Sequence, residues 1–289
     1  MLSRHFEDLS EGVWDRLADS LALNISQGEE TITDNLLLDL ARLKHPGLSM
    51  IKTPKNLESD KGTDWEWWIG NDNDGWLRYA VQAKKLNLHE LRYDTLRHVI
   101  PGKPAEFDVS GNLVSAAVAP ALQHDVLRDY ATGNGAIPLY AFYNHAMYPD
   151  YQDYWQCPNP LRYKLLGISV TPLSVVQHAL ATRGERSFER MHEKPQTIPI
   201  RCLLECPRIA AIYRGDADAS FEKFGVEAHV YGREDLPVLD FDAIAPDMPR
   251  DYALGAFPAH VYNHDIAIYP KRIMFVNTRR FDDQHIGRK

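Results

Sequence analysis

Two carboxylates, an amide and an ammonium group lie close together in residues 62–86, whose sequence is GTDWEWWIGNDNDGWLRYAVQAKKL. Asp64 and Glu66 are two residues apart, and so are Gln82 and Lys84. Side chains of a β-strand alternate between its two faces, so each pair shares one face of its strand. If the two strands are neighbours, we expect the four polar side chains to converge.

These groups have the chemistry of a metal-dependent hydrolase. The two carboxylates and the amide oxygen are hard oxygen ligands, which suit Mg²⁺ or Mn²⁺. The ammonium group of Lys84 cannot bind a metal, but it can orient a water nucleophile or stabilise charge on a phosphate. Metal-dependent hydrolysis of a phosphodiester requires this combination. The set therefore predicts a Mg²⁺ (or Mn²⁺) site in which Asp64, Glu66 and Gln82 supply oxygen ligands.

Residue patterning predicts the elements that must position this set. Residues 63–69 and 76–86 are predicted as strands, because GNDNDG between them consists of turn formers. Amphipathic helices are predicted over residues 5–23 and 29–45, from apolar residues at helical spacing. Trp65 and its neighbours on the apolar face would form the core of the hairpin.

The rest of the chain reads as a mixed α/β pattern. Residues 87–115 show little periodicity and are predicted as an irregular excursion. After about residue 183 the pattern weakens. The further predicted strands are 48–54, 136–145, 165–172, 197–206 and 264–278; the further helices are the later part of 115–133 and 173–184; and 232–252 is predicted as loop.

The strand that ends in Gln82-Ala83-Lys84, after an Asp64-bearing strand, resembles the PD-(D/E)xK nuclease superfamily. Glutamine in place of the second acid is similar to the Mrr-type restriction endonucleases. The block GTDWEWW…VQAKKL also resembles an uncharacterised bacterial family of that clan. The resemblance covers roughly residues 15–182. It implies an α/β, restriction-endonuclease-like core (α-β-β-β-α-β, a central mixed sheet flanked by helices) within residues 1–182. It gives no account of residues 183–289, which are predicted from their own pattern as an α+β extension of unknown role.

The resemblance also implies an activity and residue roles. The expected function is a divalent-metal-dependent DNA endonuclease, with a role in restriction or anti-phage defence. Asp64 would be the central metal ligand, Gln82 would bind through its side-chain oxygen, and Lys84 would position or activate the attacking water. Such nucleases usually add a glutamate from the preceding helix. Glu30 is preferred for that ligand, with Glu29 as its neighbour.

Three further residues are candidates for substrate contact, and each has an ordinary alternative. Trp68 shares the face of Asp64 and could border a groove, although the tryptophans of this segment suit packing. Lys85 could contact phosphate or lie on the surface. Gln123 could line the groove or be a surface glutamine. The acids themselves could be solvated strand residues paired with lysines, and Glu30 could simply favour the first turn of its helix.

Charge and cysteine content limit the partners and the cellular compartment that the sequence allows. The chain has 289 residues and a formal net charge of -8, and residues 1–150 carry the whole acidic excess, with 14 basic and 22 acidic residues. This disfavours coating of nucleic acid by charge alone. An odd count of three cysteines and an N-terminus without a long apolar run predict a reduced, cytoplasmic protein with no membrane anchor. Buried thiols are preferred over a zinc site formed by Cys202, Cys206 and His192.

Two other functions remain open from the sequence. One is an RNA-cleaving nuclease with the same core. The other is a catalytically inactive nucleic-acid-binding or assembly module, which the neutral Gln82 and the acidic chain permit. In the leading interpretation the partner is double-stranded DNA; a homo-oligomer is possible, although the sequence does not give the oligomeric state.

Overall fold

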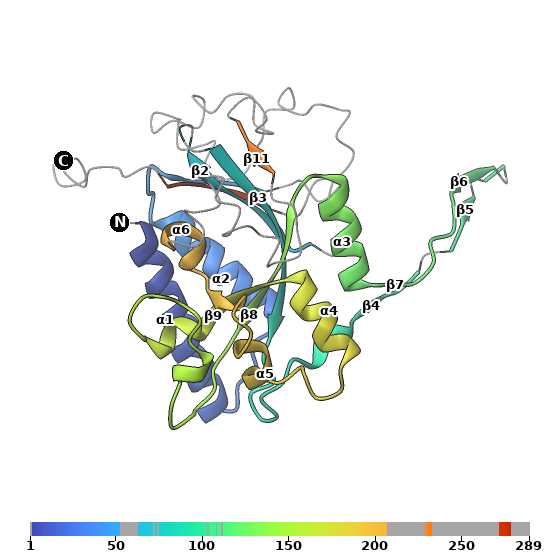
Figure 1. Cartoon of the computed structure of the whole chain (residues 1–289). Coiled ribbons are helices and arrows are strands. Elements are labelled where there is room, and N and C mark those ends of the chain that lie inside the picture. The colour runs from blue at the N-terminus through green and yellow to red at the C-terminus, as the bar shows by residue number, and fades with distance from the viewer. Residues whose placement is uncertain are drawn as a thin grey trace.

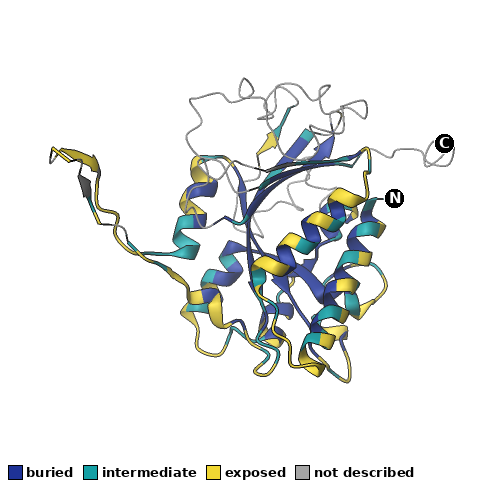
Figure 2. Cartoon of the chain, turned by 180° about the vertical axis from the view of Figure 1, so that it is seen from behind, coloured by how far each residue is buried: buried dark blue, intermediate teal, exposed yellow. Residues whose placement is uncertain are grey.

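The computed structural model describes residues 2–52, 63–71, 73, 75–102, 104–107, 109–110, 112–206, 229–232 and 272–278. Within them, a mixed β-sheet lies between helices on both faces (Figure 1). Buried residues fill the sheet and the inner sides of the helices (Figure 2). The predicted α/β class with a mixed, helix-flanked sheet is therefore confirmed.

Two N-terminal helices cover one face of the sheet. Helix α1 spans Leu2–Ala22 and α2 spans Glu29–Arg42. Their apolar residues recur at helical spacing, so each helix has a buried stripe facing the sheet. Acids in the first turn of α2 and an arginine in its last turn also complement the helix dipole. The buried residues of these stripes are Phe6, Val13, Trp14 and Leu17 in α1, and Ile32, Leu36, Leu37 and Leu40 in α2.

The main sheet has the strand order β1-β12-β2-β3-β8-β9-β10. β12 runs parallel to β2 and β8 runs parallel to β3, whereas the other neighbours along this path are antiparallel. β11 pairs with the start of β3. The strands are β1 Leu48–Lys52, β2 Trp65–Asn71, β3 Gly75–Lys85, β8 Ile137–Tyr143, β9 Ile168–Pro172, β10 Ile198–Pro199, β11 Val230–Tyr231 and β12 Arg272–Asn277.

The strands that follow residue 182 belong to the same sheet as those before it. β10 extends one edge by pairing with β9, and β12 lies between β1 and β2. Ile273 of β12 is the register partner of Glu66, and Phe275 is the partner of Trp68. The described strands of the predicted extension therefore contribute to the sheet that carries the candidate site.

Helices α3 and α4 cover the opposite face of the sheet. α3 spans Gln123–Gly133 and α4 spans Leu173–Ala181. The tyrosine hydroxyl of Tyr130 on α3 donates a hydrogen bond to Glu66 of β2, which fixes the face that α3 covers. The remaining helical elements are short: η1 Asp94–Arg97, η2 Gln152–Tyr154, η3 Tyr163–Gly167, α5 Phe188–His192 and α6 Cys202–Glu205.

The turn between β2 and β3 shows why its sequence is rich in glycine and asparagine. Gly75 has φ of +90°, a conformation that side chains disfavour. A Cβ on Gly70 would lie 2.2 Å from the backbone oxygen of Gly75, so the two strands approach too closely for another residue. The side chain of Asn71 accepts a hydrogen bond from the backbone N–H of Asn73.

Most predicted elements are confirmed, and one strand is wrong. Within 197–206 only Ile198–Pro199 is extended, and Cys202–Glu205 is helical. Proline lacks the N–H that would continue a ladder, which confines it to sheet edges and strand ends. The predicted loop over 232–252 lies outside the described residues apart from Gly232, and so does the first part of the predicted strand 264–278.

The predicted excursion contains a two-stranded arm. Its base is formed by β4 (Val99–Ile100) and β7 (Ala121–Leu122), and its outer part by β5 (Glu106–Phe107) and β6 (Leu113–Ser115). The arm projects away from the sheet and its helices (Figures 1 and 2).

A buried histidine gives the fold a predicted acid sensitivity. His192 donates from Nδ1 to the carbonyl of Phe188 (2.8 Å), and its Nε2 accepts from the hydroxyl of Ser169 (2.7 Å). Burial lowers the pKa of His192 from 6.5 to about 4. The folded protein therefore binds this proton more weakly than the unfolded chain. Stability that is present above pH 6.5 is lost as the pH falls toward 4, by about 3 kcal/mol.

Urea unfolding at pH 7.5, 5.5 and 4.5 would measure this loss. His192→Asn, which cannot titrate, is expected to show a smaller fall in the free energy of unfolding over the same range. Equal pH dependence in the two proteins would contradict the assignment.

Candidate active site

The predicted hairpin is confirmed, with its two faces sorted as its sequence indicates. β2 and β3 pair in register, with Trp67 opposite Tyr79. The backbone N–H of Asp64 donates to the carbonyl of Val81, so the pairing begins one residue before the start of β2. Trp67 faces α1, where its ring contacts Phe6 at 6.2 Å between centroids. The candidate polar residues lie on the other face of the hairpin because side chains alternate along each strand.

Asp64 and Gln82 are in direct contact at the centre of the candidate site. One carboxylate oxygen of Asp64 accepts hydrogen bonds from the Gln82 side-chain amide (2.5 Å) and from the backbone N–H of Ala83 (2.7 Å). The amide group of Gln82 also lies 3.2 Å from the carbonyl of Ala83. The other side-chain atom of Gln82, Oε1, is buried and makes no hydrogen bond within the described structure. An oxygen in this condition would be satisfied by a cation or a water molecule.

The structure brings Glu29, rather than Glu30, to Lys84. The ammonium group of Lys84 lies 3.6 Å from Oε2 of Glu29, and the Lys84 side chain is only 5% exposed. The second oxygen of Glu29 accepts a hydrogen bond from Thr95. Glu30 is exposed. Successive residues of an α-helix point about 100° apart, so only one of the two acids can face β3, and the preference for Glu30 is corrected.

The Glu66 carboxylate is bound by hydrogen-bond donors of the protein and is not available to a metal ion. Arg78 donates to both of its carboxylate oxygens, at 2.7 and 2.9 Å. The hydroxyl of Tyr130 and the indole N–H of Trp68 donate to the same two oxygens. Burial alone would lower the pKa of Arg78, but the adjacent Glu66 carboxylate outweighs it and raises that pKa. The carboxylate is 0% exposed and fully engaged, so the prediction that Glu66 binds the metal is corrected.

The ring of Trp68 packs against side chains of the neighbouring strands β11 and β12 and does not border a groove. Its ring contacts Tyr231 and Phe275, with centroids 5.1 and 6.2 Å apart. The guanidinium carbon of Arg78 lies 5.1 Å from the same ring, a cation–π contact. The side chain is buried, so the packing alternative holds for Trp68 and the substrate contact is corrected.

Lys85 and Gln123 occupy different surroundings. The ammonium group of Lys85 donates to the backbone carbonyl of Gln27, just before α2, on the face opposite to Lys84. This bond gives Lys85 a structural role, and its contact with phosphate stays a prediction. Gln123 is the first residue of α3, on the face of Asp64, and its side-chain oxygen is buried without a partner among the described residues.

Tyr140 is a residue of this site that the sequence did not indicate. It is the register partner of Gln82 on the adjacent strand β8. Its hydroxyl is buried and makes no hydrogen bond to any described residue. Burial raises the pKa of Tyr140, and the charges of Asp64 and Asp125 add to the effect. Both carboxylates are therefore within electrostatic reach of the phenol. The sequence predicted a strand over 136–145. It did not show that this strand pairs with β3, so it did not place Tyr140 beside Gln82.

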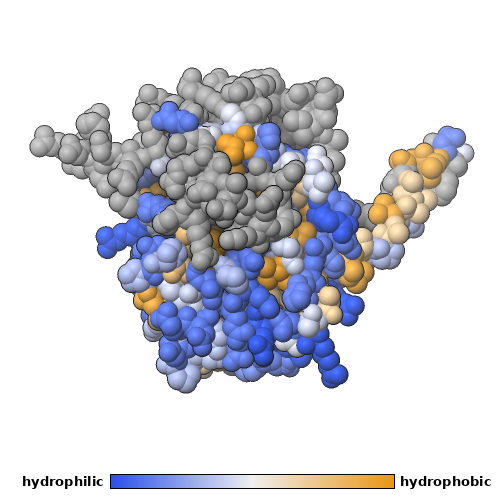
Figure 3. Space-filling model, in the orientation of Figure 1, coloured by the Kyte–Doolittle hydropathy of each residue, from blue (hydrophilic) through white to orange (hydrophobic). Residues whose placement is uncertain are grey.

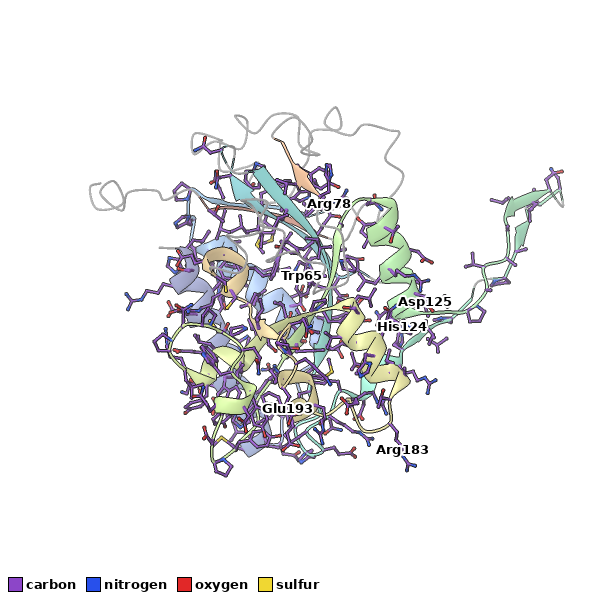
Figure 4. The ribbon with its side chains drawn as sticks, viewed as in Figure 1. Trp65, Arg78, His124, Asp125, Arg183 and Glu193 are labelled. Carbon is purple, nitrogen blue, oxygen red and sulfur yellow. The ribbon has the colours of Figure 1, made fainter. Side chains whose placement is uncertain are left out.

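Figure 4 shows how these elements are distributed. Arg78 lies on β3 beside the C-terminal end of α3, where it also donates to the carbonyl of Asn134 at 2.7 Å. His124 and Asp125 lie at the opposite end of α3, next to the base of the arm. Helix α3 thus spans the sheet face from the Glu66 network to the start of the arm.

Metal ligation by these residues rests on few donors. Among the described residues, no group of three or more His, Cys, Asp and Glu side chains could hold a metal ion. Mg²⁺, however, keeps several waters and is commonly held by one or two carboxylates together with substrate phosphates. The Asp64 carboxylate and the unpartnered Gln82 oxygen fit such a site. The donor set therefore suits a cation that is bound mainly in the presence of an anionic substrate.

The cysteines form a buried cluster of thiols. Cys157, Cys202 and Cys206 are buried and form no disulfide within the described structure, and the sulfur atoms of Cys157 and Cys202 lie 3.3 Å apart. His192 is engaged by Ser169 and Phe188 and is not a zinc ligand. The buried-thiol interpretation is therefore the one that the structure supports.

The chain belongs to a protein family that is described as "Family of unknown function (DUF6615)", whose model matches residues 2–280. No curated protein and no solved structure matches the chain. Among the residues that the structure describes, no helix is both long and apolar enough to cross a membrane.

Proposed function

We propose that the chain is a metal-dependent phosphodiesterase that cleaves DNA, with a PD-(D/E)xK-type nuclease core. The observation that carries the proposal is the contact of Asp64 with Gln82 at one end of the β2–β3 hairpin, with Lys84 on the same face of β3 as Gln82 and next to Glu29. With η1 and the arm strands β4–β7 between β3 and α3 set aside, the element order α2, β1, β2, β3, α3, β8 supports it, because it agrees with the α-β-β-β-α-β order that the resemblance implies. β12 follows these elements in the chain but lies between β1 and β2 in the sheet, and the six-element core has no strand at that place.

Each residue has a role that its surroundings support. Asp64 and the free oxygen of Gln82 would hold Mg²⁺ or Mn²⁺, which when bound polarises the phosphate as a Lewis acid. Lys84 would orient the attacking water and stabilise charge that develops on the phosphate oxygens. Glu29 would hold the Lys84 ammonium group in position. The backbone N–H of Ala83 fixes the Asp64 carboxylate.

One observation favours the non-catalytic alternative. Gln82 and Lys84 are nearly buried, and Glu66, the acid expected to compensate for the neutral Gln82, is held by Arg78. A module that only binds nucleic acid or another chain would tolerate these features. The alternative is distinguished by activity, because it predicts no cleavage with any metal.

A cleavage assay tests the proposal. The purified full chain is incubated with supercoiled plasmid, linear duplex DNA and structured RNA, each with Mg²⁺, Mn²⁺ or EDTA. We expect DNA cleavage with Mg²⁺ or Mn²⁺ and none with EDTA. Cleavage that persists in EDTA would contradict the mechanism, cleavage of RNA alone would contradict the substrate, and absence of any cleavage would favour the binding module.

Tyr140→Phe is expected to separate activity from stability. Removal of a buried hydroxyl without a described partner should leave the free energy of unfolding unchanged or raise it slightly. If the hydroxyl bonds to a bound phosphate or water, cleavage should fall about tenfold, as for the loss of one such hydrogen bond. The rate and the urea midpoint are measured on the same preparation.

Tyr143→Phe is the matched control on the same strand. The Tyr143 hydroxyl lies on the opposite face, 2.8 Å from Thr33 Oγ1 on α2. Its removal should cost about 1 kcal/mol of stability and leave cleavage unchanged. Equal cleavage by Tyr140→Phe and the unmodified protein would remove Tyr140 from the site.

A further inference from the structure

Three thiols lie together where two distant segments of the chain meet, and the proposed cleavage does not use them. Cys157 belongs to the irregular segment between η2 and η3, whereas Cys202 is the first residue of α6 and Cys206 follows the last residue of that helix. The thiol of Cys202 donates a hydrogen bond to the sulfur of Cys157 at 3.3 Å. The sulfur atoms of a disulfide lie about 2 Å apart, so a short movement separates this pair from a covalent bond.

Three hydrogen-bond donors point to the sulfur of Cys157. The thiol of Cys202, the amide of Asn159 and the guanidinium group of Arg201 lie 3.3, 3.4 and 3.9 Å from it. A neutral thiol is only a weak acceptor, whereas several donors and an adjacent cation favour the thiolate. The hydrogen bond from Cys202 contributes most to a pKa of about 5 for Cys157, although burial opposes the shift. At neutral pH the sulfur is therefore in the form that reacts with oxidants.

The guanidinium group of Arg201 is held beside this sulfur by helix α1. Glu7 of α1 accepts from Arg201, and the same carboxylate is paired with Arg162. Arg201 is therefore fixed between Glu7 and Cys157. A cation next to the sulfur is typical of reactive cysteines, whereas structural cysteines lie in apolar surroundings.

Cys157 is also the most accessible of the three thiols. It is 7% exposed, against 1% for Cys202 and 1% for Cys206, and the next residue, Pro158, is exposed. The segment lies at the lower left of Figure 1, where the surface in Figure 3 is mostly hydrophilic. A small polar oxidant from solution therefore meets Cys157 before the other two thiols.

We propose that Cys157 is a site of reversible oxidation by hydrogen peroxide and that Cys202 is its resolving thiol. The Cys157 thiolate attacks one peroxide oxygen, the O–O bond breaks, and the hydroxide that leaves takes a proton from solvent. The thiolate loses two electrons and becomes a sulfenic acid, while the peroxide is reduced to water. The sulfur of Cys202 then attacks the sulfenic sulfur, the S–O bond breaks, and the hydroxide leaves with the Cys202 proton as a second water. The product is a Cys157–Cys202 disulfide, which a dithiol reductant converts back to two thiols.

The order of the two steps follows from the proton that the pair shares. The hydrogen bond to Cys157 is the first cause that raises the pKa of Cys202, and the bond to Cys206, burial and the neighbouring charges add to it. Cys202 therefore remains protonated while Cys157 is a thiolate. The sulfenic acid is neutral, so the charge that opposes ionisation of Cys202 is removed by the first step. The inference does not depend on cleavage of nucleic acid, since it concerns the thiols alone.

Peroxide treatment of the full chain, followed by thiol counting and peptide mapping, tests the proposal. The reduced protein is treated at pH 7 with a small molar excess of hydrogen peroxide, and circular dichroism verifies that it remains folded. We expect three thiols before treatment and one afterwards, with Cys157 joined to Cys202 and Cys206 still reduced. Dithiothreitol should restore all three thiols.

Cys202→Ser separates the two steps, because it leaves the sulfenic acid of Cys157 unresolved and open to trapping by dimedone. Cys206→Ser is the matched control in the same cluster and should form the Cys157–Cys202 disulfide as the unmodified chain does. Alanine variants at these positions replace any serine variant that does not fold, and the mapping of the unmodified chain needs no variant. A Cys202–Cys206 disulfide, persistence of all three thiols, or a dimedone adduct on a cysteine other than Cys157 would overturn the proposal.

Discussion

Lys84→Met is expected to reduce metal-dependent DNA cleavage by roughly 10²–10⁴-fold while the protein remains folded. Methionine keeps most of the buried volume of the lysine stem but removes the ammonium group. That group has no substitute at its position, because the neighbouring Lys85 points to the other face and is bonded to Gln27. Initial rates of plasmid nicking, measured at saturating Mn²⁺, give the comparison.

Lys85→Met provides the control for charge and for the strand itself. The two lysines are adjacent in β3, so both variants lose one positive charge from nearly the same place in the sequence. Lys85→Met should cleave at a rate within about threefold of the unmodified protein, since no step is assigned to it. Loss of activity in both variants would indicate a general electrostatic effect. Retention of activity in Lys84→Met would refute the role of Lys84.

The hairpin of the candidate site was predictable because its determinants are local. Alternation with a period of two sorts Asp64, Gln82 and Lys84 from Trp65 and Trp67, and turn-forming residues fix where the strands reverse. These signals lie within 25 consecutive residues, so no distant contact is needed to interpret them. The helix before the hairpin was predicted equally well, but a one-residue choice between Glu29 and Glu30 depends on its rotation against β3.

The residues next to Glu66 in the sequence did not show which groups bind its carboxylate. Its strand pattern correctly placed it on the face of Asp64. Its partners are Arg78, which lies across the hairpin, and Tyr130, which comes from a helix 64 residues later. A buried carboxylate requires such partners, but the pattern in residues 62–86 cannot say whether they are protein donors or a metal.

The position of β12 was the least predictable part of the fold. Its residues have the composition of a strand, but local composition does not identify the neighbours. β12 pairs with β1 and β2, which lie about 200 residues earlier in the chain. Pairing over such a separation depends on the fit of whole sheet faces, including the stacking of Phe275 on Trp68.

Arg78→Ala is expected to destabilise the fold by about 3–5 kcal/mol, the effect of leaving a buried carboxylate without its counter-ion. Glu66 is 0% exposed, and Arg78 provides two of its four observed hydrogen bonds. Tyr130 and Trp68 remain as neutral donors, which cannot balance the charge. Urea unfolding at pH 7.5 measures the loss. Arg128→Ala is the matched control, because Arg128 pairs with Asp125 at 48% exposure, where a salt bridge contributes about 1 kcal/mol or less.

The double variant Arg78→Met/Glu66→Gln should be more stable than Arg78→Ala alone. It removes both charges together, and the glutamine oxygen can still accept from Tyr130 and Trp68, so the main penalty of the single variant disappears. This non-additivity distinguishes an ion pair from simple loss of packing around Trp68. If the double variant is instead the less stable of the two, the Arg78–Glu66 pair contributes through its geometry, and the charge argument fails. Recovery of stability would show that Glu66 is present in β2 to hold the sheet and helix α3 together, leaving Asp64 and Gln82 as the ligand-capable groups of the site.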